Sequence, residues 1–165
     1  MKPDAADKSP APADSFEPSR PAVISQPGEG VVVRAFGNEI CFQLTSEQSG
    51  GALNVGLATV PPGGRVPPHV QTREEELFLV IEGRYRFSIN GEWKEVGPGG
   101  VVYIPRGVAH TFEVLGEQPG RHWVLSSPGG FDRFYARCSE IFAQPGPPDF
   151  SRMPAINAEF GIRMV

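Results

Sequence analysis

Three residues of this chain that could bind a metal ion lie close together in one short stretch. His69 and Gln71 are two positions apart, and Glu76 follows at the start of a strongly apolar run. If the backbone is extended at residues 69–71, alternate side chains project to the same face, so the imidazole and the amide would point the same way. A strand that begins at Glu76 would add a carboxylate. His110 starts a second apolar run further along the chain and offers a fourth group.

The chemistry expected of these four residues is that of a non-haem metal site. Two neutral imidazoles and one carboxylate on one face form the facial triad that suits Fe(II) and leaves positions open for oxygen and substrate. His69, Glu76 and His110 would make this triad. Gln71 would either add its amide oxygen as a fourth ligand or only hydrogen-bond to a ligand or a water. We expect one divalent ion, Fe(II) first, with Mn(II), Zn(II) or Ni(II) as alternatives.

Both stretches resemble the two sequence motifs of the cupin superfamily. The first family motif is a glycine, five residues, H-x-H, three or four residues, a glutamate, six residues and a glycine. The second is a glycine, five residues, P-x-G, two residues, a histidine, three residues and an asparagine. Gln71 replaces the second histidine of the first motif, and Val114 stands where the asparagine is usual. The matching positions are Gly63, His69, Glu76, Gly83, Gly99, Pro105, Gly107 and His110.

The resemblance implies a fold and a range of activities. The fold would be all-β, a double-stranded β-helix or jelly-roll barrel. Similarity to small quercetin dioxygenase-like cupins implies an oxidoreductase, a dioxygenase whose metal binds a small aromatic, enol or polyketide-like molecule beside O2. A non-redox isomerase or cyclase with Zn(II), or a ligand-binding cupin without turnover, are the alternatives. Few residues besides the ligands could move protons, with His122 and Tyr103 as the candidates, and this favours the oxygenase.

The pattern along the chain also predicts strands followed by helices. Short apolar runs separated by turn residues, with Gly37-Asn38 and Asn90-Gly91 as hairpin turns, are typical of an all-β barrel or sandwich. Apolar residues recur at helical spacing from Phe131 to Phe142, and a second short helix is expected over residues 151–160, ending at Gly161. We therefore predict a disordered arm over 1–29, rich in Pro, Ala, Ser and Asp, a barrel over 30–128, and a helical extension packed on it over 129–165.

Strand alternation predicts which side chains surround the metal. Counting from Glu76 and His110, the side chains that face inward are apolar, and together they would form a cavity for a flat small molecule. His122 has no partner motif and is interpreted either as a packed strand histidine or as a catalytic base. The expected substrate-pocket residues are Phe78, Val80, Phe87, Phe112 and Val114.

Charge and hydropathy indicate which classes of partner the protein has and where in the cell it is expected. The net charge is −4, from 15 basic and 19 acidic residues, and the basic residues are scattered, which argues against nucleic acid. No apolar stretch approaches the roughly 18 residues of a membrane span, so we expect a cytoplasmic protein without a membrane partner. Its partners would be a small-molecule substrate and, for an oxygenase, O2. The apolar face formed by Leu77, Leu79 and Ile81 needs a cover and predicts a homodimer.

Overall fold

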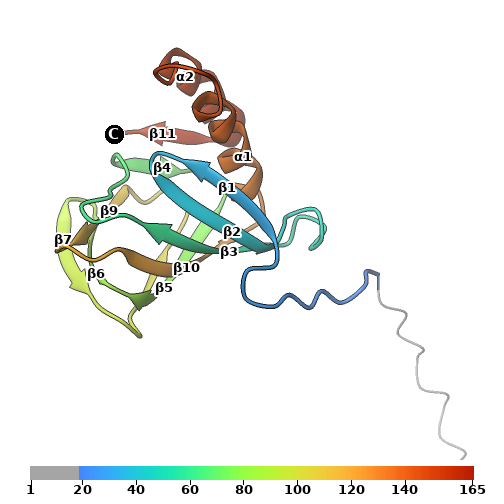
Figure 1. The fold of residues 1–165 in the computed structure, drawn as a ribbon, viewed down its shortest axis with the longest axis horizontal. Coiled ribbons are helices and arrows are strands. Elements are labelled where there is room, and N and C mark those ends of the chain that lie inside the picture. Colours follow the sequence, from blue (N-terminus) through green and yellow to red (C-terminus); the bar gives the residue numbers. More distant parts are fainter. Residues whose placement is uncertain (1–18) are drawn as a thin grey trace, which may run out of the picture.

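Two antiparallel sheets packed face to face make up most of the molecule (Figure 1). The computed structural model describes residues 19–165. One sheet contains, in spatial order, β1 (Val31–Ala35), β2 (Asn38–Leu44), β3 (Asn54–Val60), β10 (Gly120–Ser127), β5 (Glu75–Glu82) and β8 (Val101–Ile104). The other contains β11 (Ile162–Met164), β4 (His69–Gln71), β9 (His110–Leu115), β6 (Arg84–Ile89) and β7 (Glu92–Val96). The predicted all-β jelly-roll architecture is confirmed.

The hairpin turns set the strand register. Asn90 and Gly91, with φ of 50° and 91°, connect β6 and β7 as predicted. The first turn is one residue earlier than predicted, because Ala35 pairs with Asn38 and leaves Phe36 and Gly37, with φ of 54° and 79°, as the two turn residues. Positive φ at both central residues gives the turn the same twist as its strands. Asn38 therefore belongs to β2, where its side chain is buried at 4% exposure.

The helical extension follows β10 and returns to the barrel. It contains α1 (Phe131–Phe142), the short η1 (Phe150–Arg152) and α2 (Met153–Phe160), which agrees with the predicted helices. Gly161 ends α2 in the left-handed conformation with φ of 71°, which a glycine adopts without steric cost. Directly afterwards β11 pairs with β4, and Met164 lies opposite His69. The end of the described chain thus becomes a strand of the barrel beside the predicted metal motif.

The start of α1 is fixed to the barrel by buried polar contacts. Asp132 accepts hydrogen bonds from the backbone N–H and the hydroxyl of Ser46, and the backbone N–H of Gly130 donates to Asn54 Oδ1 at 3.2 Å. The apolar side of the helix packs against β1. These contacts hold the extension across one end of the barrel.

The predicted disordered arm falls largely outside the described residues, since residues 1–18 are not among them. Residues 19–29 contain no helix or strand, and the hydroxyl of Ser25 donates to the carbonyl of Gln43 at 2.8 Å. Within the described part of the chain, the helices are too short and too polar to cross a membrane.

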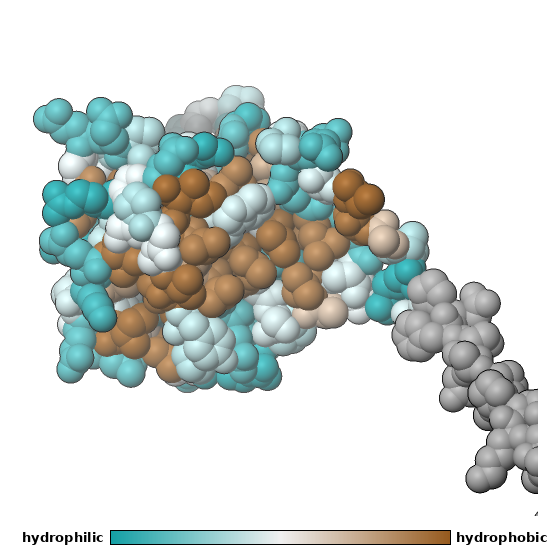
Figure 2. Space-filling view, turned by 90° about the horizontal axis from the view of Figure 1, so that it is seen from below, coloured by the Kyte–Doolittle hydropathy of each residue, from teal (hydrophilic) through white to brown (hydrophobic). Residues whose placement is uncertain are grey.

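The outer face of the six-stranded sheet is apolar. Leu77 and Leu79 of β5 lie opposite Leu125 and Trp123 of β10, and the row continues to Leu57 of β3. Figure 2, which views the molecule from below, shows apolar side chains spread over a broad part of its surface. The extension packs on β1 and β4 and leaves this face uncovered.

Candidate metal centre and cavity

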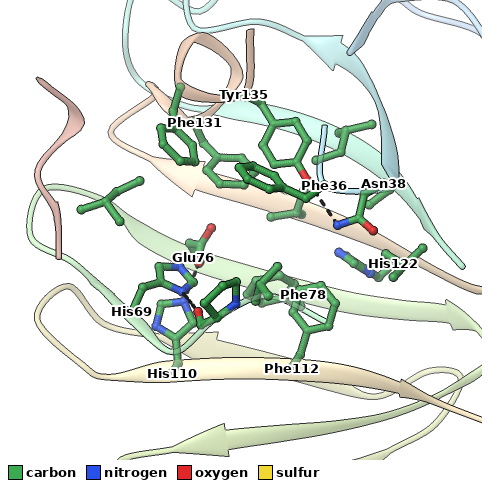
Figure 3. A pocket seen from close by; sticks show the side chains of 18 of the residues that line it. Phe36, Asn38, His69, Glu76, Phe78, His110, Phe112, His122, Phe131 and Tyr135 are labelled. Carbon is green, nitrogen blue, oxygen red and sulfur yellow. Dashed lines mark hydrogen bonds and ion pairs between the residues drawn. The ribbon is translucent and has the colours of Figure 1, made fainter. Parts of the chain in front are cut away.

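Three strands bring His69, Glu76 and His110 together. His69 on β4 lies directly opposite His110 on β9, and the centroids of their rings are 4.3 Å apart. Glu76 reaches them from β5, with Oε2 at 3.0 Å from Nε2 of His110. The potential ligand atoms of the three residues all lie within 4.8 Å of one another. Figure 3 shows the three side chains converging at one end of a cavity.

Backbone carbonyls orient both imidazole rings. Nδ1 of His69 lies 3.0 Å from the carbonyl oxygen of Pro67, and Nδ1 of His110 lies 3.0 Å from that of Val108. A carbonyl only accepts, so each Nδ1 carries the proton and donates it, which leaves the lone pair of the neutral ring on Nε2. Metal-binding histidines are held in this way, with one nitrogen bound to the protein and the other to the ion.

The two histidines differ in how they respond to burial. Burial lowers the pKa of His69, and the neighbouring His110 lowers it further. For His110, burial also opposes the charged form, but the hydrogen bond and the negative charge of Glu76 outweigh it and raise the pKa. A cation in the place of the shared proton would meet the same carboxylate. The donor set of two imidazoles and one carboxylate therefore fits a divalent metal ion.

Gln71 is buried beside this cluster, at 3% exposure. Neither its amide oxygen nor its amide nitrogen has a hydrogen-bond partner among the described residues. Alternation along β4 places it on the same side as His69, although it is not one of the residues that line the cavity. A buried amide without partners costs free energy, and a metal ion or a metal-bound water would satisfy its oxygen. Direct ligation by Gln71 stays a prediction.

An apolar cavity of about 120 Å³ begins at the triad. Phe78 and Phe112 form part of its wall, as predicted. Much of the opposite wall belongs to the C-terminal extension, which covers the open end of the barrel. The extension contributes Phe131, Phe134, Tyr135, Met153, Asn157, Ile162 and Met164.

Three predicted pocket residues do not line the cavity. Val80, Phe87 and Val114 face inward, as strand alternation requires, and are at most 2% exposed. At their level, however, side chains fill the space between the sheets: the ring of Phe87 lies 5.3 Å from that of Phe78 and 5.7 Å from that of Phe112, centroid to centroid. In this structure the three residues belong to the packed core and not to the lining of the cavity.

Tyr103, one of the two residues considered for proton transfer, lies away from the cavity. It lies on the outer face of β8, is 56% exposed, and donates its hydroxyl proton to Glu75 Oε2 at 2.8 Å. Alternation along β5 turns Glu75 outward and Glu76 inward. Tyr103 therefore has no access to the cavity.

His122, the other candidate, lines the cavity. It is 2% exposed, and Nδ1 lies 2.9 Å from the hydroxyl oxygen of Tyr85. Burial lowers its pKa to about 4, with only partial compensation from the charge of Glu76. The ring is therefore neutral at pH 7.

The sequence analysis missed most of the cavity residues, among them Asn38, Phe36 and Tyr135. Asn38 and Phe36 come from the first hairpin, and Tyr135 comes from α1. Asn38 Nδ2 donates to the hydroxyl oxygen of Tyr135 at 3.3 Å. Asn38 points inward because the turn consists of Phe36 and Gly37, which makes Asn38 the first residue of β2. The spacing of aromatic residues in α1 predicts which side of that helix is buried, but not that this side lines the cavity.

Comparisons with known proteins agree with this architecture. The sequence profile described as "Cupin domain" matches residues 56–125. An uncharacterised protein of Streptomyces coelicolor is 36% identical over 78 residues, which is 46% of this chain and 71% of that protein. The protein named polyketide synthase CurC, from Streptomyces cyaneus, is 31% identical over 74 residues, 45% of this chain and 48% of its own length. An RmlC-like cupin structure from Shewanella frigidimarina superposes with a TM-score of 0.59 at 16% identity, covering 69% of this chain and 97% of that one.

Proposed function

Because the chain belongs to the cupin superfamily, we propose that it is a metal-dependent oxidoreductase, a dioxygenase that acts on a compact aromatic or enol molecule. The observation that carries the proposal is the triad of His69, Glu76 and His110, whose ligand atoms converge at one end of an apolar cavity. Bound Fe(II) would supply Lewis-acid polarisation of a substrate oxygen and one-electron chemistry with O2. Mn(II), Zn(II) and Ni(II) are the alternative ions.

The protein's own residues would bind the substrate and keep water away from it. The rings of Phe78 and Phe112 stand 6.1 Å apart, centroid to centroid, and present aromatic surface beside the triad. Glu76 balances part of the charge of a divalent ion, and the two imidazoles add none. The C-terminal extension covers part of the cavity and reduces its contact with water, which strengthens electrostatic interactions inside it.

The size of the cavity limits the substrate to about one ring. An engineered apolar cavity of about 150 Å³ accepts benzene, and this one is about 120 Å³. A flavonol, with its three rings, would require the extension to move away. The similarity to the protein named polyketide synthase CurC supports a polyketide-derived aromatic or enol within this size range.

The cavity offers little support for a non-redox isomerase or cyclase. Such an enzyme needs a group near the metal that takes up and returns a proton. His122 is the only imidazole of the cavity outside the triad, and with a pKa of about 4 it is a weak base at pH 7.

Metal analysis combined with oxygen uptake tests the proposal. We expect about one divalent ion per chain, and O2 consumption with single-ring catechols or small cyclic β-diketones but not with flavonols. The His110→Ala variant should lose both the ion and the oxygen uptake. A protein without a bound ion, or a metal-loaded protein that consumes no O2 with any of these compounds, would contradict it.

We also propose that the protein forms a homodimer through the outer face of the six-stranded sheet. Leu79, Val101 and Tyr103 are 36%, 59% and 56% exposed on this face, and a continuous apolar surface of this kind marks an interaction site. Light scattering at micromolar concentration should give twice the chain mass. Leu79→Lys should shift the protein to the monomer, while Lys94→Glu on β7 should not. A monomeric mass for the unchanged protein would contradict the dimer.

A further inference from the structure

The cavity has a second polar end, away from the triad. Figure 3 shows Asn38, His122 and Tyr135 on one side of the cavity and His69 and His110 on the other. The aromatic side chains of the walls lie between these two groups. A small molecule in this space would have a polar environment at both ends and an apolar environment along its length.

Asn38 has an unused hydrogen-bond acceptor at this end. Its side-chain nitrogen donates to Tyr135, whereas Oδ1 has no partner among the described residues. Three other described residues also have buried side-chain atoms without partners, namely Asn54, Gln71 and Ser126, but Asn38 is the only one of the four that lines the cavity. Leaving a buried carbonyl oxygen unpaired is costly, so a ligand that donates a hydrogen bond there gains affinity.

His122 adds a donor to the same end. The buried hydroxyl of Tyr85 has no acceptor other than His122 Nδ1 among the described residues. Its proton therefore goes to Nδ1, and the neutral ring carries its own proton on Nε2. An amide oxygen that accepts and an imidazole N–H that donates are the two complements of a hydroxyl group.

We propose that Asn38 recognises a hydroxyl group on the substrate, placed across the ring from the oxygen that binds the metal. This proposal rests on the proposed function and narrows its substrate class. The substrate is a single-ring phenol or enol with oxygen at both ends: one oxygen reaches the triad and the other donates to Asn38 Oδ1. Compounds with a methyl group in the second position fit the space but leave Oδ1 unpaired.

Binding of two matched probes to the zinc-loaded protein tests this assignment. Zinc does not change oxidation state, and the titrations are made without oxygen, so no turnover interferes. The probes are 1,2,4-trihydroxybenzene and 4-methylcatechol, which differ by a hydroxyl against a methyl group of similar size. We expect the trihydroxy compound to bind about tenfold more tightly, measured by calorimetry, as the loss of one buried hydrogen bond predicts. Equal affinities, or no binding of either probe, would overturn the proposal.

Two variants separate recognition from a structural role. Asn38→Leu removes the acceptor and should abolish the preference for the trihydroxy compound. Tyr135→Phe removes the partner of the Asn38 nitrogen but keeps Oδ1, and should retain the preference. A preference that survives Asn38→Leu would overturn the assignment. If a variant does not fold, the comparison of the two probes in the unchanged protein still tests the proposal. Zinc affinity is measured first, so failure to bind zinc contradicts the proposed function, whereas equal probe affinities contradict only the role of Asn38.

Discussion

The two ends of the cavity each contain a buried histidine, yet their chemistry is opposite. His110 lies 3.0 Å from the carboxylate of Glu76, which raises its pKa against the effect of burial. His122 lies 2.9 Å from the uncharged hydroxyl of Tyr85, and burial lowers its pKa to about 4. Both rings are at most 3% exposed. Burial opposes a positive charge on both rings, and only the carboxylate beside His110 outweighs that effect.

Because of this difference, the two ends of the cavity suit different ligand groups. The triad end has a net negative group and two oriented lone pairs, so it is suited to a cation. The end with Asn38 and His122 contains only neutral groups and is suited to an uncharged polar group of a ligand. A small substrate lying between them would be oriented by both.

The largest expected effect is the difference in zinc affinity between two single variants, each of which removes a histidine at one end of the cavity. His110→Ala deletes a ligand, and we expect zinc affinity to fall by more than the roughly 10- to 100-fold that loss of an outer hydrogen-bond partner costs. His122→Ala should leave zinc affinity unchanged, because this ring contacts Phe78 and Tyr85 rather than the triad. Calorimetric titration of both variants measures the difference. Equal losses would mean that the site is misassigned.

The neutral, buried His122 should make the folded protein less stable at acidic pH. The unfolded chain binds a proton at His122 near its ordinary pKa of 6.5, and the folded chain only near pH 4. The unfolding free energy should therefore fall as the pH drops from about 6.5 to about 4, by roughly 3 kcal/mol from this residue alone. Denaturant unfolding across this range should show a shallower dependence in His122→Phe than in the unchanged protein. Identical slopes would refute the lowered pKa.

Gln71→His has the smallest expected effect. It tests whether Gln71 is a direct metal ligand. If the amide is a direct ligand, the better imidazole donor should tighten binding of Ni(II) or Zn(II) by about 1.4 kcal/mol, roughly tenfold. Competition with a chelator of known affinity measures this change. Unchanged affinity and selectivity would show that Gln71 only hydrogen-bonds near the ion.

The metal end was predictable from the sequence, and the other end was not. His69, Glu76 and His110 stand at fixed spacings within two short motifs, and alternation along a strand determines which of Glu75 and Glu76 faces inward. The existence and type of the strands and helices also followed from short apolar runs and from helical spacing after residue 130.

The far end depends on contacts between distant segments. Asn38 was assigned to a turn because Gly-Asn is a common turn pair, whereas the register of β1 and β2 moves the turn to Phe36 and Gly37. Alternation predicts that Val80 and Val114 face inward, but it cannot say where packing ends and the cavity begins. Pairing of β11 with β4, which adds Ile162 and Met164 to the cavity wall, joins segments about 90 residues apart and leaves no local pattern.

X-ray absorption spectroscopy of the zinc-loaded protein tests the central claim most directly. We predict a first coordination shell of nitrogen and oxygen at about 2.0–2.2 Å, with the outer scattering of two imidazole rings. That imidazole signal should drop to one ring in His110→Ala, if any zinc is retained, and should be unchanged in His122→Ala. A shell with no imidazole scattering, or one that changes with His122 instead of His110, would contradict the assignment of His69, Glu76 and His110 as the metal site.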